Sequence, residues 1–147
     1  MEKYISGDYT SVQGCISRSE DCSDVGDFED IYYSFRLDYA PPKGGVPDYS
    51  PTQRSYWKIE FKSIQDDLKK INLDNTYGKE FGGLNEDINP CTRNGFTGAK
   101  NGKVIPEWNL AKGIKYDDSA LITKIENGKI VKQYRYIRSK KIWRKVE

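Results

Sequence analysis

The chain has no histidine among its 147 residues. Histidine is the commonest general base and the usual partner of a catalytic serine or cysteine, so Ser-His and Cys-His nucleophile pairs are excluded. The usual zinc sites that combine cysteine with histidine are excluded as well. Any catalysis must therefore use carboxylates, hydroxyls, lysine, arginine or backbone groups.

Cysteine is also scarce in the chain. The three cysteines, Cys15, Cys22 and Cys91, form no C-x-x-C pair, so the sequence predicts no zinc site and no structural metal. Cys15 and Cys22 could close a small loop in an oxidising compartment, but a chain of this size does not need a disulfide framework. We expect three reduced, mostly structural thiols.

Long apolar runs and a large charge of one sign are absent too. Residues 1–8 lack a basic start followed by an apolar run, and no later stretch approaches the roughly 18 apolar residues of a membrane span. We therefore expect no signal peptide and no membrane span, although a secreted domain could be delivered as the tail of a longer polypeptide. The formal net charge of +2 is small for a dedicated phosphate-binding protein.

The length predicts a single domain over residues 1–147, because domains usually span about 100–200 residues. Residues 1–27 are rich in Ser, Asp, Gly and Cys and predict a loop-rich start before a core over 28–147. Aromatic and β-branched residues predict a strand over 28–37, and alternation predicts another over 55–62.

The middle of the chain predicts one helix and one long connection. Ser63 can cap a helix over 63–71, which carries acidic residues near its start and lysines near its end. Residues 72–103 are rich in glycine and lack periodicity, which is typical of an irregular connection. A short strand follows over 104–110, where Pro106 favours a sheet edge or a bulge.

The end of the chain carries a hairpin pattern. Two apolar runs, 120–126 and 129–134, flank Asn127-Gly128, the dipeptide that supplies the positive φ angles of a type I′ turn. A last strand follows over 141–146. These elements predict an α+β domain of small split antiparallel sheets with one or two helices.

Two short patterns lie at the ends of predicted strands. The first is Arg36-x-Asp38-x-x-Pro41-Pro42, an arginine followed by an aspartate and a proline turn. Taken alone, an arginine at the end of a strand is usually a solvated or ion-paired surface residue.

The second pattern is a glutamate in the strand predicted over 104–110. Glu107 is followed six and seven residues later by Gly113-Ile114. Together, the two patterns resemble those of the ADP-ribosyltransferase toxin family, in its branch of cholera-toxin, pertussis-toxin and scabin- or pierisin-like enzymes. The resemblance covers about half of the chain, in two blocks, and implies an ADP-ribosyltransferase-like fold and cleavage of NAD.

The resemblance also implies catalytic roles. Glu107 would hold the ribose and stabilise the positive charge that develops on the sugar as the nicotinamide bond breaks. Ser50 would hold Glu107 and the ribose in place; because it lies only 14 positions after Arg36, Ser55 is an alternative. Many members carry Glu or Gln two residues before the catalytic glutamate, where this chain has Ile105.

The residues implied in NAD binding come from both patterns. Arg36 would bind the pyrophosphate through charge-assisted hydrogen bonds, and Asp38 would orient it. The aromatic candidates for stacking on nicotinamide are Tyr56, Trp57 and Trp108.

A toxin of this kind uses NAD as a substrate and no metal. The implied partners are NAD, a protein or nucleic-acid acceptor in a target cell and a cognate immunity protein, with no membrane. The chain would be secreted or delivered as part of a larger polypeptide and act in the target-cell cytoplasm.

Three other functions stay open. In an NAD glycohydrolase toxin, water replaces the acceptor, and Ile105 favours this. A histidine-free ribonuclease or nucleic-acid-binding module would use residues 134–145, where aromatics alternate with cations, although edge protection by charge also explains that segment. A non-enzymatic binding or immunity protein is the third.

Overall fold

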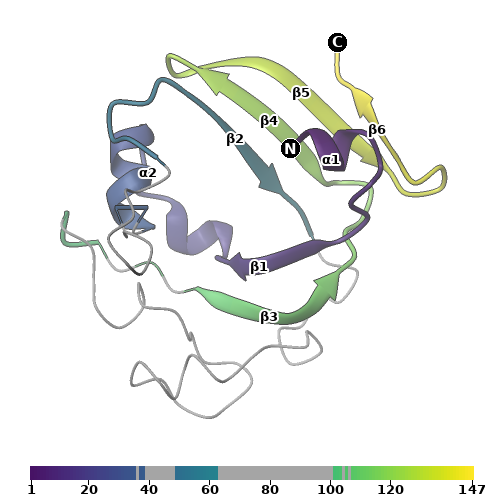
Figure 1. The fold of residues 1–147 in the computed structure, drawn as a ribbon, viewed down its shortest axis with the longest axis horizontal. Coiled ribbons are helices and arrows are strands. Elements are labelled where there is room, and N and C mark those ends of the chain that lie inside the picture. Colours follow the sequence, from purple (N-terminus) through teal and green to yellow (C-terminus); the bar gives the residue numbers. More distant parts are fainter. Residues whose placement is uncertain (36, 39–48, 63–100, 104, 106) are drawn as a thin grey trace. The chain divides into compact units, whose positions relative to one another are not determined.

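The structure, a computed structural model, describes residues 1–35, 37–38, 49–62, 101–103, 105 and 107–147. This part of the chain is mostly β, with two short helices and two small antiparallel sheets, which confirms the general α+β prediction. The elements in chain order (Figure 1) are α1 (Glu2–Ile5), β1 (Val12–Ile16), the 3₁₀ turn η1 (Ser19–Cys22), α2 (Phe28–Ser34), β2 (Ser55–Glu60), β3 (Trp108–Ile114), β4 (Leu121–Glu126), β5 (Lys129–Ile137) and β6 (Ile142–Lys145).

The chain divides into two compact units. Unit 1 comprises Met1–Gln13, Arg54–Ile71 and Lys112–Glu147, and unit 2 comprises Gly14–Gln53 and Asn72–Ala111. Unit 1 holds α1 and the four-stranded sheet, while unit 2 holds η1 and α2.

The four-stranded sheet of unit 1 has the strand order β2-β4-β5-β6, and each neighbouring pair is antiparallel. The predicted hairpin is confirmed: β4 and β5 are joined by Asn127 and Gly128, with φ of 49° and 74°. The predicted strands over 55–62 and 141–146 are present as β2 and β6. All four strands follow local signals in the sequence.

Aromatic rings form the core of unit 1. The ring of Tyr116 lies edge-on to that of Tyr136, with 4.5 Å between centroids, and Trp143 lies within 5.3 Å of both. Phe61 adds an edge contact to Tyr116 at 6.3 Å. Helix α1 lies beside β6 in this unit (Figure 1). The sheet is thus buried on one side near the β5–β6 turn.

The second sheet pairs β1 with β3. The prediction of a loop-rich start over 1–27 is therefore wrong in part, since α1, β1 and η1 lie there. The strand predicted over 104–110 begins only at Trp108 and continues to Ile114. It passes through Gly113, where a Cβ would lie 2.4 Å from the Ser11 side chain, so the close approach of the two segments requires glycine.

The strand predicted over 28–37 is wrong, because Phe28–Ser34 forms helix α2. Asp27 caps the helix by accepting a hydrogen bond from the backbone N–H of Asp30 at 3.0 Å. Acidic residues in the first turn favour a helix through its dipole, and the buried pair Phe28 and Tyr32 lies one turn apart on one face. Arg36 therefore follows a helix rather than the end of a strand.

Two predicted elements, the helix over 63–71 and nearly all of the connection over 72–103, lie outside the described residues. Among the residues that are described, no helix has the length and apolar content needed to cross a membrane.

Candidate functional site

The residues predicted to form the site belong to different parts of the chain. Ser50, Asp38, Glu107 and Trp108 lie in unit 2, whereas Tyr56 and Trp57 lie on β2 in unit 1. Arg36 lies outside the described residues.

Glu107 lies immediately before β3 and two residues after the buried Ile105. Its neighbours Ile105 and Trp108 are each only 2% exposed, while Glu107 itself is partly exposed. Two apolar side chains are therefore buried on either side of a partly exposed carboxylate.

The thiol of Cys22, at the end of η1, lies within electrostatic reach of Glu107. Burial raises the pKa of this thiol, and the charges of Asp21, Glu107 and Asp24 raise it further. The thiolate is the nucleophilic form of cysteine, so Cys22 stays protonated and is a poor nucleophile. Of the two groups, the Glu107 carboxylate is therefore a better candidate for a catalytic role than the Cys22 thiol.

Trp108 is covered by the guanidinium of Arg18, whose central carbon lies 5.0 Å from the indole centroid. Arg18 is held by Asp21 at 2.7 Å and by Glu20 at 3.3 Å, and its pKa is raised, chiefly by the hydrogen bond to Asp21. The indole is thus a packed part of unit 2. A planar ligand could stack on it only after Arg18 moved.

Ser50 lies in a polar turn of unit 2. Its hydroxyl lies 2.9 Å from that of Thr52 and accepts a hydrogen bond from the Thr52 backbone N–H at 3.3 Å. The Gln53 N–H donates to the Ser50 carbonyl at 3.0 Å, which closes the turn. Side-chain bonds of this kind are typical of turn-forming serines. The side chain is exposed and available to a ligand on its solvent side.

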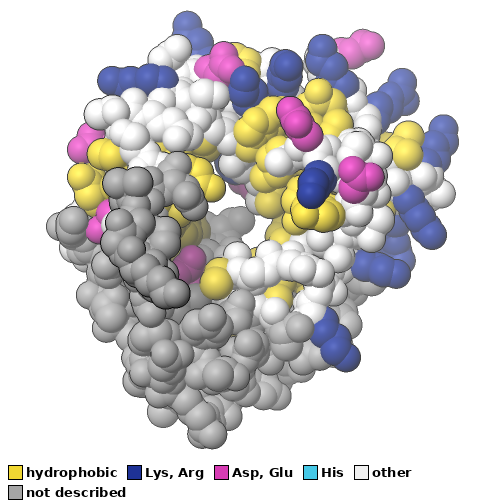
Figure 2. Space-filling view, in the orientation of Figure 1, with side chains coloured by type: hydrophobic (Ala, Val, Ile, Leu, Met, Phe, Trp, Pro, Cys, Tyr) yellow, Lys and Arg dark blue, Asp and Glu magenta, His cyan; other side chains and the backbone are white. Residues whose placement is uncertain are grey.

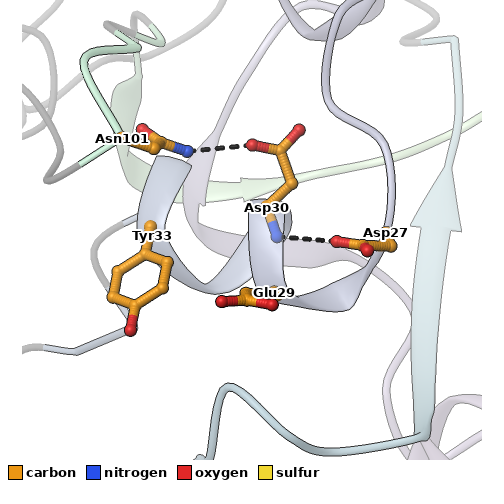
Figure 3. Close-up of a pocket in the computed structure, with 5 residues that line it drawn as sticks. All are labelled: Asp27, Glu29, Asp30, Tyr33 and Asn101. Atoms are coloured by element: carbon orange, nitrogen blue, oxygen red, sulfur yellow. Dashed lines mark hydrogen bonds between the residues drawn. The ribbon is translucent and has the colours of Figure 1, made fainter.

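An open hollow of about 260 Å³ lies beside α2 and was not predicted from the sequence. Its lining residues are Asp27, Glu29, Asp30, Tyr33 and Asn101 (Figure 3). The Asn101 amide points at the Asp30 carboxylate and donates to it at 2.9 Å, and it also donates to Ser34 at 3.0 Å. The spacing Asp27-x-x-Asp30, which is typical of a capped helix start, was the signal that could have revealed this feature.

The Asp30 carboxylate is fully engaged by the protein. The Lys103 ammonium donates to it at 2.6 Å and, together with the Gly26 backbone N–H, holds the pKa of Asp30 below its usual range. Lys103 also donates to the Asp24 carbonyl. These contacts fasten residues 101–103 to α2, so the hollow is better explained as a structural junction than as a ligand site. In the described residues, no group of acidic and cysteine side chains is arranged to hold a metal ion.

No family model, no curated protein and no solved structure matches the chain. The functional proposal therefore depends on the chain's own residues.

Trp57 and Tyr56 lie in the four-stranded sheet. The Trp57 ring lies beside that of Tyr134, with 6.4 Å between centroids and 35° between planes, and the Lys124 ammonium lies 5.9 Å from the Trp57 centroid. Tyr56 pairs across the strands with Ile125. Since consecutive residues of a strand point to opposite faces, these two predicted partners of nicotinamide lie on opposite faces of the sheet.

Proposed function

We propose that the protein is an NAD-dependent ADP-ribosyltransferase, a toxin or effector that transfers ADP-ribose to a macromolecule. The observation that carries the proposal is the pair of patterns that begin at Arg36 and at Glu107. A partly exposed carboxylate at the start of a strand, next to a thiol that stays protonated, supports the role given to Glu107.

The proposed reaction breaks the bond between the ribose C1′ and the nicotinamide nitrogen. The electron pair of that bond leaves with nicotinamide, and the acceptor then bonds to C1′ and releases a proton. Glu107 would stabilise the oxocarbenium-like sugar, which needs a nearby negative charge rather than a histidine base. Arg36 would hold the pyrophosphate, with Asp38 orienting it, and Ser50 would hold the ribose.

The finer fold assignment belongs to the same proposal. An ADP-ribosyltransferase-like arrangement of two small antiparallel sheets would bring NAD between them. The chain has a two-stranded and a four-stranded sheet, which is compatible with that arrangement.

A second candidate, NAD glycohydrolase activity, is favoured by one observation. Ile105, two residues before Glu107, is 2% exposed, so this position offers no polar group that could bind an acceptor. Water would then attack C1′, and free ADP-ribose would be the product.

Incubation with NAD labelled on its adenine tests both candidates. Wild type should release nicotinamide and give either labelled macromolecule or free ADP-ribose. Glu107→Gln should reduce the rate by about 10²–10³-fold, as removal of one transition-state group does in other enzymes. Glu29→Gln, which removes an exposed carboxylate from the same unit, is the matched control and should keep the wild-type rate.

Two results would refute the proposal. One is the absence of any nicotinamide release by wild-type protein supplied with cell extract as a source of acceptors. The other is full activity of Glu107→Gln. Conversion of NAD to free ADP-ribose alone would select the glycohydrolase.

A further inference from the structure

The C-terminal hairpin concentrates positive charge in one part of unit 1. Residues 129–145, which include β5 and β6, contain eight Lys and Arg and no Asp or Glu. Figure 2 shows Lys and Arg side chains gathered on the side where Figure 1 draws these strands. Among the described residues, none of the eight forms an ion pair. The nearest acidic side chain is Glu126, which lies opposite Lys129 and whose pKa is lowered chiefly by Lys124 and also by Lys132, so the cluster keeps a positive excess.

The strand register sorts these side chains between the two faces of the sheet. Lys132 lies opposite Lys124, and Lys124 lies opposite Trp57, so the three share one face. Tyr134, two residues after Lys132, points to the same face and lies opposite Lys145. We call the set Trp57, Lys124, Lys132, Tyr134 and Lys145 the aromatic–basic face.

The aromatic–basic face is open at this end of the sheet. Trp57 and Tyr134 are partly exposed, and Lys132 and Lys145 are exposed. By contrast, Tyr136 and Trp143, further along the same face, are 7% exposed and belong to the aromatic core. The sequence alone could not make this distinction within residues 134–145.

We propose that the aromatic–basic face binds single-stranded nucleic acid. Two neighbouring rings on adjacent parts of a sheet offer flat faces on which unpaired bases stack, and flanking cations neutralise the phosphates. The net positive charge of the hairpin complements a polyanion, and the rings distinguish a strand with exposed bases from other anions. The four residues to which the proposed function gives roles, Arg36, Asp38, Ser50 and Glu107, do not belong to this face, although Trp57 is also a candidate for stacking on nicotinamide.

Protection of a sheet edge explains only part of the arrangement. Edge strands carry lysines to discourage pairing with other chains, and β6 is an edge in the order β2-β4-β5-β6. Tyr134, however, lies where β5 pairs with β4 on one side and with β6 on the other, whereas Lys132 lies before the residues of β5 that pair with β6. Edge protection can therefore account for Lys132 but gives no reason for the two neighbouring rings of Trp57 and Tyr134. Lys132 lies directly opposite Lys124, and Glu126 on the same face forms an ion pair with Lys124. Both lysines lower the pKa of Glu126, so one carboxylate compensates part of the charge, and this face keeps a positive excess that a bound anion would balance.

Titration with a short oligo(dT) strand, without NAD, tests the proposal through tryptophan fluorescence. Trp108 and Trp143 are 2% and 7% exposed, so quenching by stacked bases should come mainly from Trp57. Tyr134→Leu should weaken binding about 5- to 150-fold, the usual loss for one stacked base. Its thermal unfolding, measured in parallel, separates lost stacking from lost folding.

The charges are tested with two matched double variants. Lys132→Gln with Lys145→Gln removes two cations from the aromatic–basic face, while Arg135→Gln with Arg144→Gln removes two from the opposite face of the same strands. The first should lower the slope of log affinity against log salt by about 1.4, since each phosphate contact on a single strand contributes about 0.7. The second should leave this slope unchanged.

Several outcomes would overturn the proposal. These are equal effects of the two double variants, no quenching of Trp57, displacement of the oligonucleotide by saturating NAD, and stronger binding to duplex DNA, anionic vesicles or polyglutamate than to oligo(dT). None of them bears on the release of nicotinamide from NAD, which is a separate readout, so each proposal can fail without the other.

Discussion

Gly113 belongs both to the motif that suggests NAD chemistry and to a tight contact between two segments. A Cβ at this position would lie 2.4 Å from the Ser11 Oγ, 3.1 Å from the Ser11 Cβ and 3.1 Å from the Gln13 Cγ. Rotation of the serine hydroxyl relieves the shortest contact but leaves the Ser11 Cβ, which is fixed to the backbone. Gly113→Ala should therefore destabilise unit 1 directly.

The expected cost follows from two opposing effects. Forcing an extra methyl group into a packed contact costs about 1–3 kcal/mol. Alanine has less conformational entropy to lose than glycine, which returns about 0.5–1 kcal/mol. Gly113→Ala should thus lower the free energy of unfolding by about 1 kcal/mol, the centre of a range of about 0–2.5 kcal/mol.

Urea unfolding followed by far-UV circular dichroism measures this loss. Ser11→Gly removes both serine contacts, so the double variant with Gly113→Ala should recover most of the stability relative to Ser11→Gly alone. Gly26→Ala is the control, because its Cβ would meet only the Asp30 carboxylate, at 3.8 Å, so it should keep or raise the stability, by up to about 1 kcal/mol. If Gly113→Ala keeps wild-type stability yet loses NAD cleavage, the glycine serves the chemistry rather than the contact.

Two further variants test other parts of the structure. Burial raises the pKa of the Tyr116 phenol to about 12 from the ordinary 10.0, and within the described residues neither this hydroxyl nor the Trp143 indole N–H has a hydrogen-bond partner. The unfolded chain then releases this proton first, so wild type should lose about 2–3 kcal/mol more than Tyr116→Phe as the pH rises from about 10 to 12. Equal losses of unfolding free energy for wild type and Tyr116→Phe, measured by urea unfolding across this pH range, would refute this. Asp27→Ala removes the α2 cap and should cost about 1 kcal/mol, whereas Asp27→Asn should keep most of the stability, and equal losses would argue against the cap.

The elements that were predicted correctly have signals within a few residues. Asn127-Gly128 supplies both positive φ angles between two apolar runs, and β2 alternates apolar with charged residues. No distant contact is needed to recognise either. The hairpin and its flanking strands are therefore the part of the fold that the sequence predicts well.

The errors arise where local composition and distant packing disagree. Tyr32, Tyr33 and Phe35 favour a strand by composition, but the Asp27 cap and the burial of one helical face against unit 2 outweigh that preference. Strand β1 has Gly14 at φ 90° in the middle of its five residues, which interrupts any local strand pattern, so its pairing with β3 makes it a strand. Neither effect is visible in a window of neighbouring residues.

The candidate site shows the same limit. The sequence could name Trp57 and Glu107 as chemically suitable, but not that Tyr134 lies beside Trp57 or that Cys22 lies near Glu107. Both neighbours come from pairings between segments that are far apart in the chain. The sequence thus indicates which side chains are chemically suitable, but not which residues surround them.

The uneven distribution of charge also determines over what distance the hairpin can act. Residues 1–128 contain 16 Lys and Arg against 21 Asp and Glu, so they carry a net charge of −5 before the hairpin is added. Electrostatic fields decay over about 8 Å at physiological ionic strength. Beyond a few such lengths a partner encounters a nearly neutral protein, and only at close range does it encounter the cations of β5 and β6. Long-range attraction should therefore contribute little to the association rate, and encounters should become productive only through short-range contact.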